Sequence, residues 1–453
     1  MAQAVMLPAR ILPPGPKGSF LLGHAPSLAR NWSGFADSCA KEYGDIVSYR
    51  FLRVPICQVT HPDGIDYVLV RNAANFHKSR DYAAIRSILG NGLLTSEGSF
   101  WQAQRQLIQP AFRHDNIAVY AEIMADSTAK FLQRWGDGES RDVHHEMADL
   151  TLDIVTKSLF GSEVPAQAQG IGLQIAAVME RFLSQAALSF LLPEGMPLPK
   201  GPALIRARRH LDRIITAIIQ ERRASRAPAN DLLQLLLAAQ DEHGTRMTDE
   251  QLRAEILTLF LAGHETTANA LTWTWYLLSQ NPEAEENLSK ELNRVLGGRA
   301  PALTDLPRLR YTEMVMKESL RLYPPAWGVG RQAIHDFELG GYRIPAGTNI
   351  FIMQWITQRD PRFFPKPEQF LPERWREDPI RTGRIPRFAY FPFGGGPRVC
   401  VGAGFAMMET TLLLATIAQR YRLTLLPDAV VTPLFSVTLR PKHGIRMRLD
   451  RRS

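Results

Sequence analysis

The chain has 453 residues, of which 45% are apolar and 22% charged, so it is a globular rather than a disordered protein. This length accommodates one large core or two domains. Its three cysteines are odd in number and sparse, which argues against a disulfide framework and for a reducing compartment. No uncharged apolar run reaches the roughly 18 residues of a membrane span, and we expect a soluble, cytoplasmic protein.

The net charge of +8 raises the question of a nucleic-acid partner. No finger, recognition helix or aromatic platform is present and the charges are spread along the chain, so we expect no nucleic-acid partner. One stretch, residues 373–387, is locally basic. A solvated surface is its simplest interpretation. A docking patch for an acidic electron-transfer protein is the alternative. Its arginines are Arg374, Arg376, Arg381, Arg384 and Arg387.

Sequence periodicity predicts a mainly α protein with a small β-rich portion built from both ends of the chain. The β-rich portion is expected at about 40–75, 335–355 and 420–453, and the helical portion at about 95–330 and 400–420. Strands are predicted at 46–51, 56–60, 342–352, 421–426 and 445–449. Breaks between helices are expected near 136–138, 192–202 and 227–231.

One predicted helix is unusually long. Thr248 and Gln251 form a capping-box pattern, and the helical pattern continues to Gln280, just before Asn281-Pro282. That is roughly 45 Å of helix at 1.5 Å per residue. Because the mean globular helix is about a third as long, this one is expected to cross the whole domain.

The middle of that helix reads Ala-Gly-His-Glu-Thr-Thr, residues 262–267. A zinc-protease motif would need a second histidine where Ala268 stands. Thr266 can donate a hydrogen bond to the carbonyl of Ala262, which bends the helix locally. Taken alone, this pattern is most simply a tolerated kink in a buried helix.

Cys400 lies on a glycine-rich loop, two residues after Arg398. A thiolate is a strong, soft metal ligand that needs nearby positive charge and N–H groups. The apolar helical stretch 405–418 places the loop at a helix N-terminus, where an anion is favoured. A lone cysteine is more often inert core. The residues that a phosphate loop needs are missing, and residues 387–390 are a poor strand for a dinucleotide turn.

The full pattern Phe393-x-x-Gly396-x-Arg398-x-Cys400-x-Gly402 resembles the haem-binding signature of the cytochrome P450 family, and the resemblance extends over nearly the whole chain. It implies haem b (iron protoporphyrin IX) with Cys400 as axial ligand. It also implies a single P450-type domain over residues 1–453, with the long helix over the haem, as in soluble bacterial-type members. In the family's oxygen-activation motif, Thr266 would donate a hydrogen bond to dioxygen and Glu265 would relay protons.

Further site residues follow from the same resemblance. Trp101 and Arg105, four apart on one helical face, would bind the haem propionates, whose charges need partners. Arg331 and Arg398 would join them, and His77 is a weaker candidate. Phe393 and Gly402 complete the cofactor-binding positions.

Glu318 and Arg321 lie three residues apart on a helix, which predicts an ion pair. Together with Arg374 they resemble the family's buried Glu-Arg-Arg network, to which we assign a structural role. Trp375 stands where the family more often has phenylalanine.

The resemblance also suggests the walls of a substrate pocket, including a loop at 82–94. Nearly all of these residues are apolar, so a hydrophobic substrate such as a fatty acid or terpenoid is expected. Arg80 and Arg86 are either carboxylate anchors at the pocket mouth or ordinary solvent-exposed charges. The predicted wall residues are Tyr82, Ile88, Leu89, Phe182, Thr258, Leu259, Ala262, Ala326, Trp327, Val329 and Phe435.

The leading hypothesis is therefore a monomeric monooxygenase that inserts one oxygen atom from dioxygen into an apolar substrate. No flavin or iron–sulfur motif is attached, so electrons would come from a ferredoxin- or flavodoxin-type partner with its reductase. Residues 12–16 resemble the family's proline-rich N-terminal segment, and no anchor precedes them. A peroxide-using relative, a haem-based gas sensor and a basic nucleic-acid binder are the alternatives.

Overall fold

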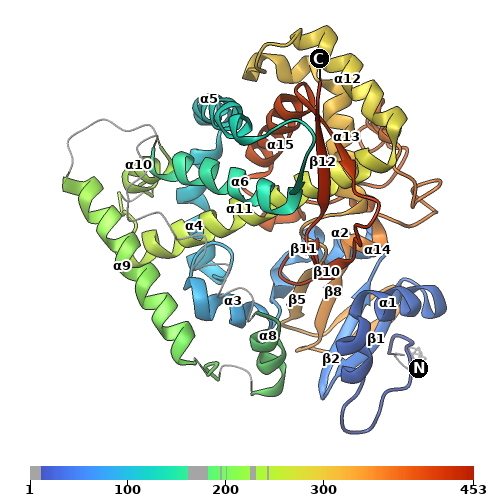
Figure 1. The fold of residues 1–453 in the computed structure, drawn as a ribbon. Coiled ribbons are helices and arrows are strands. Elements are labelled where there is room, and N and C mark those ends of the chain that lie inside the picture. The colour runs from blue at the N-terminus through green and yellow to red at the C-terminus, as the bar shows by residue number, and fades with distance from the viewer. Residues whose placement is uncertain are drawn as a thin grey trace, which may run out of the picture.

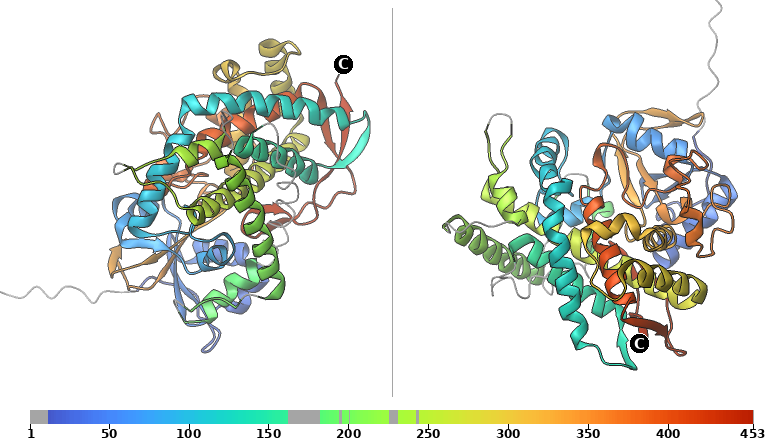
Figure 2. Two further views of the ribbon diagram at one scale, coloured as in Figure 1. Left: turned by 90° about the vertical axis from the view of Figure 1, so that its left-hand side faces the viewer. Right: turned by 90° about the horizontal axis from the view of Figure 1, so that it is seen from above.

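The computed structural model describes residues 12–161, 182–193, 196–199, 201–224, 231–241 and 244–452. As predicted, the fold is mainly α with small sheets. Figures 1 and 2 show the main sheet gathered with the N-terminal helix at one end of the molecule, while most helices pack at the other. None of the described helices combines the length and the apolar composition that crossing a bilayer requires.

The main sheet joins distant parts of the chain. Its order is β1-β2-β8-β5-β3, with β2 and β8 parallel and the other pairs antiparallel. The strands are β1 (Ile46–Phe51), β2 (Val54–Val59), β3 (Phe76–Lys78), β5 (Val329–Ala333) and β8 (Asn349–Ile352). Two segments about 290 residues apart therefore share one sheet, as Figure 1 shows.

Smaller sheets complete the β portion. One has the order β4-β12-β9, and two hairpins are separate. These strands are β4 (Glu139–Asp142), β6 (Phe337–Leu339), β7 (Tyr342–Ile344), β9 (Tyr421–Leu425), β10 (Pro433–Phe435), β11 (Leu439–Pro441) and β12 (Arg446–Arg451).

The helices form the larger part of the molecule and enclose the main apolar core. They are α1 (Ala25–Tyr43), α2 (Pro62–Asp66), α3 (Tyr82–Leu89), α4 (Gly98–Ile108), α5 (His114–Phe131), α6 (Val143–Phe160), α8 (Phe182–Leu191), α9 (Pro202–Ala224), α10 (Leu232–Ala238), α11 (Asp249–Gln280), α12 (Pro282–Leu296), α13 (Arg310–Leu322), α14 (Gln354–Thr357) and α15 (Ala403–Ala418).

Helix α11 confirms the prediction of one long central helix. It has 32 residues, begins after Thr248 with the predicted capping box, and ends at Gln280. Its flanks, Leu252–Leu261 and Thr267–Trp275, are buried on all sides, which is the condition for a helix that runs through a core. Figure 1 shows α11 passing through the middle of the helical part, beside α6.

Several parts of the chain differ from the expectation. The strand predicted at 342–352 is two strands, β7 and β8, that belong to different sheets, and the β-rich portion predicted at 40–75 also contains helix α2. Residues 82–89 were expected to form a loop, but they form helix α3, because Ala84, Ile85, Ile88 and Leu89 give it one buried apolar face. Helix α1 was not predicted, and it covers the strands β1 and β2 with Leu28 and Cys39. The local sequence of both helices carries only a weak helix-forming pattern, and tertiary packing stabilises them.

The predicted Glu318, Arg321 and Arg374 come together in a buried network. Glu318 and Arg321 have no exposed surface, and Arg321 Nη2 lies 2.8 Å from Glu318 Oε1. Arg374 Nε donates to the same oxygen at 2.9 Å. Trp375 Nε1 donates to Glu318 Oε2 at 2.9 Å, a bond that phenylalanine cannot make. Burial alone would raise the pKa of Glu318, but hydrogen bonds and charge from Arg321 and Arg374 lower it below its ordinary value.

We predict that Glu318→Gln destabilises the protein by about 3–5 kcal/mol, because it leaves the buried Arg321 charge uncompensated. Urea unfolding of the parent and the variant measures this difference. Glu313→Gln on the same helix is the matched control, since its ion pair with Lys317 is partly exposed and removing such a pair costs less than about 1 kcal/mol. Equal losses in the two variants would contradict the assignment.

Candidate active site

The Cys400 loop has a backbone that requires glycine. Gly396 has φ +66°, and a Cβ there would lie 1.8 Å from the carbonyl oxygen of Leu69. The loop therefore approaches the π-helical turn Tyr67–Arg71 more closely than any side chain allows. The amide of Cys400 donates to the carbonyl of Phe393 at 3.0 Å and closes the loop.

The Cys400 thiol lies just before the N-terminus of α15. Burial raises the pKa of this thiol, whereas a hydrogen bond from the Gly402 amide and the charge of Arg105 lower it. Arg105 Nη1, from α4, also donates to the carbonyl of Val399 at 2.8 Å. The net effect is a raised pKa. The positive charge that favours the thiolate comes from Arg105, whereas Arg398, which the sequence placed beside the sulfur, turns to Trp101 and Glu97.

A group of cations lies beside this loop. The Arg398 guanidinium stacks over the Trp101 ring, 4.5 Å from its centroid, and forms an ion pair with Glu97. Arg398 Nη1 is buried and has no hydrogen-bond partner among the described residues. Arg331, on β5, is also buried, and its charge interacts with those of Arg398 and Glu97. Trp101, Arg331 and Arg398 are thus brought together as the sequence predicted.

Lys78 is a member of this group that the sequence interpretation missed. It lies on the buried face of β3, its Nζ donates to the carbonyl of Ser96, and it lies 3.7 Å from Glu97 Oε1. Burial and the charges of Arg398 and other arginines lower the pKa of Lys78 to about 7. The available signal was the alternation of Phe76, His77 and Lys78, which turns His77 outward and Lys78 inward.

The middle of α11 is the candidate opposite wall. Ala262 is exposed and residues 263–266 are partly exposed, although the helix is buried on both sides of them. Thr266 Oγ1 donates to the carbonyl of Ala262 at 2.6 Å, which confirms the predicted bond. The helix continues through this turn without a break. Glu265 Oε1 accepts a hydrogen bond from Thr438 Oγ1 at 2.6 Å.

The residues present fit haem. Ala262 and Ala326 are exposed although each follows a largely buried stretch, and Cys400 is exposed at the end of its loop, as expected of residues that border an internal space. The unpartnered Arg398 Nη1 is a donor of the kind that a propionate needs. Lys78, Arg105, Arg331 and Arg398 gather here, and Glu97 pairs with Arg398. Two further carboxyl groups, Asp81 near Arg331 and Glu255 near Lys78, have raised pKa values because they are buried, so the group retains positive charge that two additional negative charges would suit.

The other predicted pocket residues have varied surroundings. On α11, Thr258 and Leu259 are buried, and so are Ile88 and Leu89 on α3. Tyr82 interacts with Arg331. Their roles in binding, together with those of the residues that follow, stay predictions. Trp327 and Phe435 pack ring to ring, Val329 is partly buried in β5, and Phe182 begins α8, where its side chain lies outside the described residues.

Arg80 and Arg86 border a cavity of about 490 Å³ that Lys78, Tyr82 and Glu97 also line. The Arg86 guanidinium donates to the carbonyl of Thr95, and Arg80 donates to that of Leu192. Apolar residues such as Met196 and Leu198 form the other side of the cavity. The structure therefore places both arginines beside α3 and α8, on the side of the cation group.

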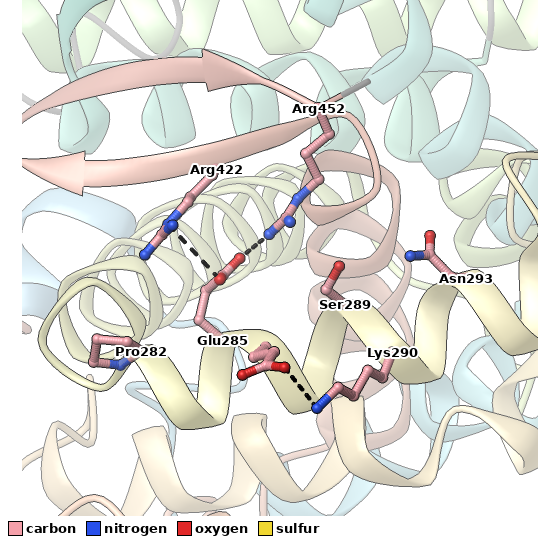
Figure 3. Close-up of a pocket in the computed structure, with 8 residues that line it drawn as sticks. Pro282, Glu285, Ser289, Lys290, Asn293, Arg422 and Arg452 are labelled. Carbon is pink, nitrogen blue, oxygen red and sulfur yellow. Dashed lines mark ion pairs between the residues drawn. The ribbon is translucent and has the colours of Figure 1, made fainter.

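Another cavity, of about 450 Å³, lies on the surface beside α12 (Figure 3). There Arg422 and Arg452 both reach Glu285, and Lys290 pairs with Glu286. The arginine, lysine and glutamate charges at this surface are therefore paired with one another. Within the described part of the chain, no group of three or more His, Cys, Asp or Glu residues is arranged to hold a metal ion. The Cys400 loop is therefore the candidate active site.

Glu409 is a second residue that the sequence interpretation missed. It lies on α15, is 1% exposed, and accepts a hydrogen bond from Thr267 Oγ1 at 3.1 Å. Its other oxygen, Oε1, has no partner among the described residues. Burial raises the pKa of Glu409 to about 8, and the Thr267 bond offsets this in part. Burial therefore favours the protonated form of Glu409.

We predict that Glu409→Gln removes a pH dependence of stability. Because the pKa of Glu409 rises from 4.5 to about 8 on folding, the folded parent binds more protons across this range and loses stability as the pH increases. The slope is at most about 1.4 kcal/mol per pH unit. Urea unfolding at several pH values should show that the unfolding free energy of the variant, minus that of the parent, increases with pH. The increase should not exceed about 1.4 kcal/mol per pH unit. A constant difference between them would refute the assignment, and Glu313→Gln is the exposed control.

Comparison with known proteins agrees with this geometry. The family model for cytochrome P450 matches residues 13–447. The chain is 39% identical to cyclooctatin synthase of Streptomyces melanosporofaciens, over 92% of this chain and 91% of that protein. It is 35% identical to cyclooctat-9-en-7-ol 5-monooxygenase of the same organism, over 91% and 89%. The structure resembles retinoic acid bound cyanobacterial CYP120A1, with a TM-score of 0.85, 27% identity, and coverage of 98% of this chain and 100% of that one. The chain therefore belongs to the cytochrome P450 family, whose members are haem-thiolate monooxygenases.

Proposed function

We propose that this enzyme hydroxylates a cyclic terpenoid, either a hydrocarbon or an alcohol derived from it. The observation that carries the proposal is the extent of similarity to two enzymes whose names refer to cyclooctatin and to a cyclooctatenol. The resemblance to a structure that binds retinoic acid, another isoprenoid, adds support. Apolar residues dominate the predicted pocket, as binding of such a molecule requires.

The bound haem supplies the activation of dioxygen at its iron, and the side chains supply ligation and protons. Cys400 is the proposed axial ligand, held by the Gly402 amide and near Arg105. The proposed propionate partners are Trp101, Arg105, Arg331 and Arg398, to which we add Lys78.

On the α11 side, Thr266 is the proposed hydrogen-bond donor to dioxygen. Its hydroxyl has one proton, which it donates to the carbonyl of Ala262, so it must turn away from that carbonyl to donate elsewhere. Glu265 is the proposed residue that passes protons toward Thr266.

Electrons come from a redox partner, and we propose that an acidic ferredoxin docks on the arginines at 376–387. Arg376, Arg381, Arg384 and Arg387 are exposed, in the segment that leads into the Cys400 loop. Arg374 is excluded from this surface, because it binds the buried Glu318. A positive surface beside the cysteine loop would steer an acidic protein toward it.

The substrate class is tested by the shift of the ferric Soret band on titration with cyclic terpenoids, linear fatty acids and steroids. We expect cyclic terpenoid hydrocarbons or alcohols to bind roughly tenfold more tightly than fatty acids, since one such factor needs only about 1.4 kcal/mol of better packing. Ala262→Leu should weaken the terpenoids most, because it fills the small-residue position of α11.

Arg86→Ala is the matched variant that tests the alternative, a carboxylate substrate such as a fatty acid. It should leave terpenoid binding unchanged, since a neutral ligand makes no use of a cation. Tightest binding by fatty acids, together with its loss in Arg86→Ala, would replace the terpenoid proposal with a carboxylate substrate.

The docking surface is tested by the double variant Arg381→Glu, Arg384→Glu. We expect the rate of reduction by an acidic ferredoxin to fall at low ionic strength and its dependence on salt to flatten, because the steering charge is reversed. Stopped-flow reduction of the haem measures both. The control is the double variant Arg446→Glu, Arg451→Glu. Both arginines lie on β12, in the β4-β12-β9 sheet, and not in the proposed docking segment. Equal losses in both variants would contradict a local docking site.

A further inference from the structure

A buried hydrogen-bond chain connects Glu265 to helix α6. Thr438 Oγ1 donates to Glu265 Oε1 at 2.6 Å, and Asn269 Nδ2 lies 3.0 Å from Thr438 Oγ1. Asn269 Oδ1 lies 3.1 Å from His144 Nε2. Asn269 is fully buried and Thr438 is 5% exposed, so the chain runs through the protein interior.

The orientation of the Asn269 amide sets the direction of the bonds in this chain. The Asn269 amide nitrogen can only donate, so the Thr438 hydroxyl oxygen accepts from it. The single Thr438 proton is then available to Glu265 Oε1. At the other end, His144 Nε2 carries the proton that Asn269 Oδ1 accepts. Glu265 is thus the final acceptor, and a carboxylate suits that position.

Thr438 belongs to a segment that is itself held in place. It lies between β10 and β11, and the next residue, Leu439, donates its amide to the carbonyl of Pro325 at 2.9 Å. Trp273 Nε1, from α11, donates to the carbonyl of Leu439 at 3.0 Å. The hydroxyl therefore reaches Glu265 from a fixed backbone beside α11, in the turn that joins β10 to β11, two strands labelled in Figure 1.

The same hairpin carries a predicted wall of the substrate pocket. Phe435, on β10, packs against Trp327 and Trp355 with ring centroids 5.2 and 5.0 Å apart. Trp327 Nε1 in turn donates to the carbonyl of Ser436 at 2.9 Å, two residues before Thr438. A substrate that packs on Phe435 or Trp327 would therefore press on the segment that orients Glu265.

From these contacts we propose that Thr438 is a positioning residue that holds the Glu265 carboxylate in the orientation for proton delivery. Thr438 touches neither the substrate nor the cofactor in this role and acts through Glu265. The inference rests on the proposed role of Glu265 beside Thr266. It assigns a function to a threonine far from every motif in the sequence.

The test compares two substitutions of Thr438 that each remove one of its two side-chain groups. Thr438→Val keeps the shape of the side chain and removes the hydroxyl, whereas Thr438→Ser keeps the hydroxyl and removes the methyl group. We expect Thr438→Val to raise the fraction of electrons released as hydrogen peroxide by roughly threefold or more, because the lost bond is to a charged acceptor. Thr438→Ser should behave like the parent. The holoenzyme is assayed with a ferredoxin, its reductase and the tightest-binding terpenoid of the panel.

Controls separate this effect from a structural one. Thr272→Val removes a different buried hydroxyl, on α11, that donates only to the carbonyl of Ala268 at 2.7 Å among the described contacts. It should leave peroxide release unchanged. In a Glu265→Ala background, Thr438→Val should add nothing further, since its effect passes through Glu265. Urea midpoints of the same single and double variants should be less than additive, which reports the contact independently of turnover.

The outcomes distinguish the inference from the proposed function. If Thr266→Ala and Glu265→Gln release peroxide but Thr438→Val does not, the role of Thr438 is wrong and the proposed function stands. If neither Thr266→Ala nor Glu265→Gln changes peroxide release, the roles proposed for these residues fail and the inference falls with them. Equal peroxide release by Thr438→Val and Thr438→Ser would show that only packing matters.

Discussion

The position of the cysteine loop depends on the hydrogen bonds and ion pairs of the buried Glu318 carboxylate. It accepts five hydrogen bonds, from Arg321 twice, Arg374, Trp375 and the amide of Leu371. Arg321 also donates to the carbonyls of Gln358, Pro367 and Gln369. Because a buried charge must keep its partners, α13 and the irregular segment 358–375, which follows α14, stay together. That segment leads directly into the Cys400 loop.

The active-site region has two opposite requirements, and the fold meets them on different elements. The carboxylates of haem need positive charge, and in the proposed site β3, β5, α4 and the cysteine loop would supply it through Lys78, Arg331, Arg105 and Arg398. An apolar substrate needs an uncharged surface, for which the middle of α11 offers Ala262 and Gly263. Glu97 moderates the charge by bridging Lys78 and Arg398. The cations are thereby held close together despite their mutual repulsion.

Local sequence patterns predicted those features whose defining residues are neighbours in the sequence. The ends of α11 were readable because the capping box and Asn281-Pro282 are local features. The pair Glu318 and Arg321 was readable because residues three apart on a helix are neighbours. The helix α3 was missed because its eight residues carry only a short apolar pattern. Its stability comes from contacts with α8 and α11, which no local rule reveals.

The sequence by itself determined the chemical groups, their spacing and the backbone freedom of the loop: a thiol, an arginine two residues before it, and a glycine where only glycine fits. Tertiary structure alone decided which charges meet. Arg374 belongs to a basic stretch but is directed to Glu318, while Thr438 reaches Glu265 across 173 residues of chain. Ionisation and hydrogen bonding depend on burial and on distances through space, and sequence separation does not specify either.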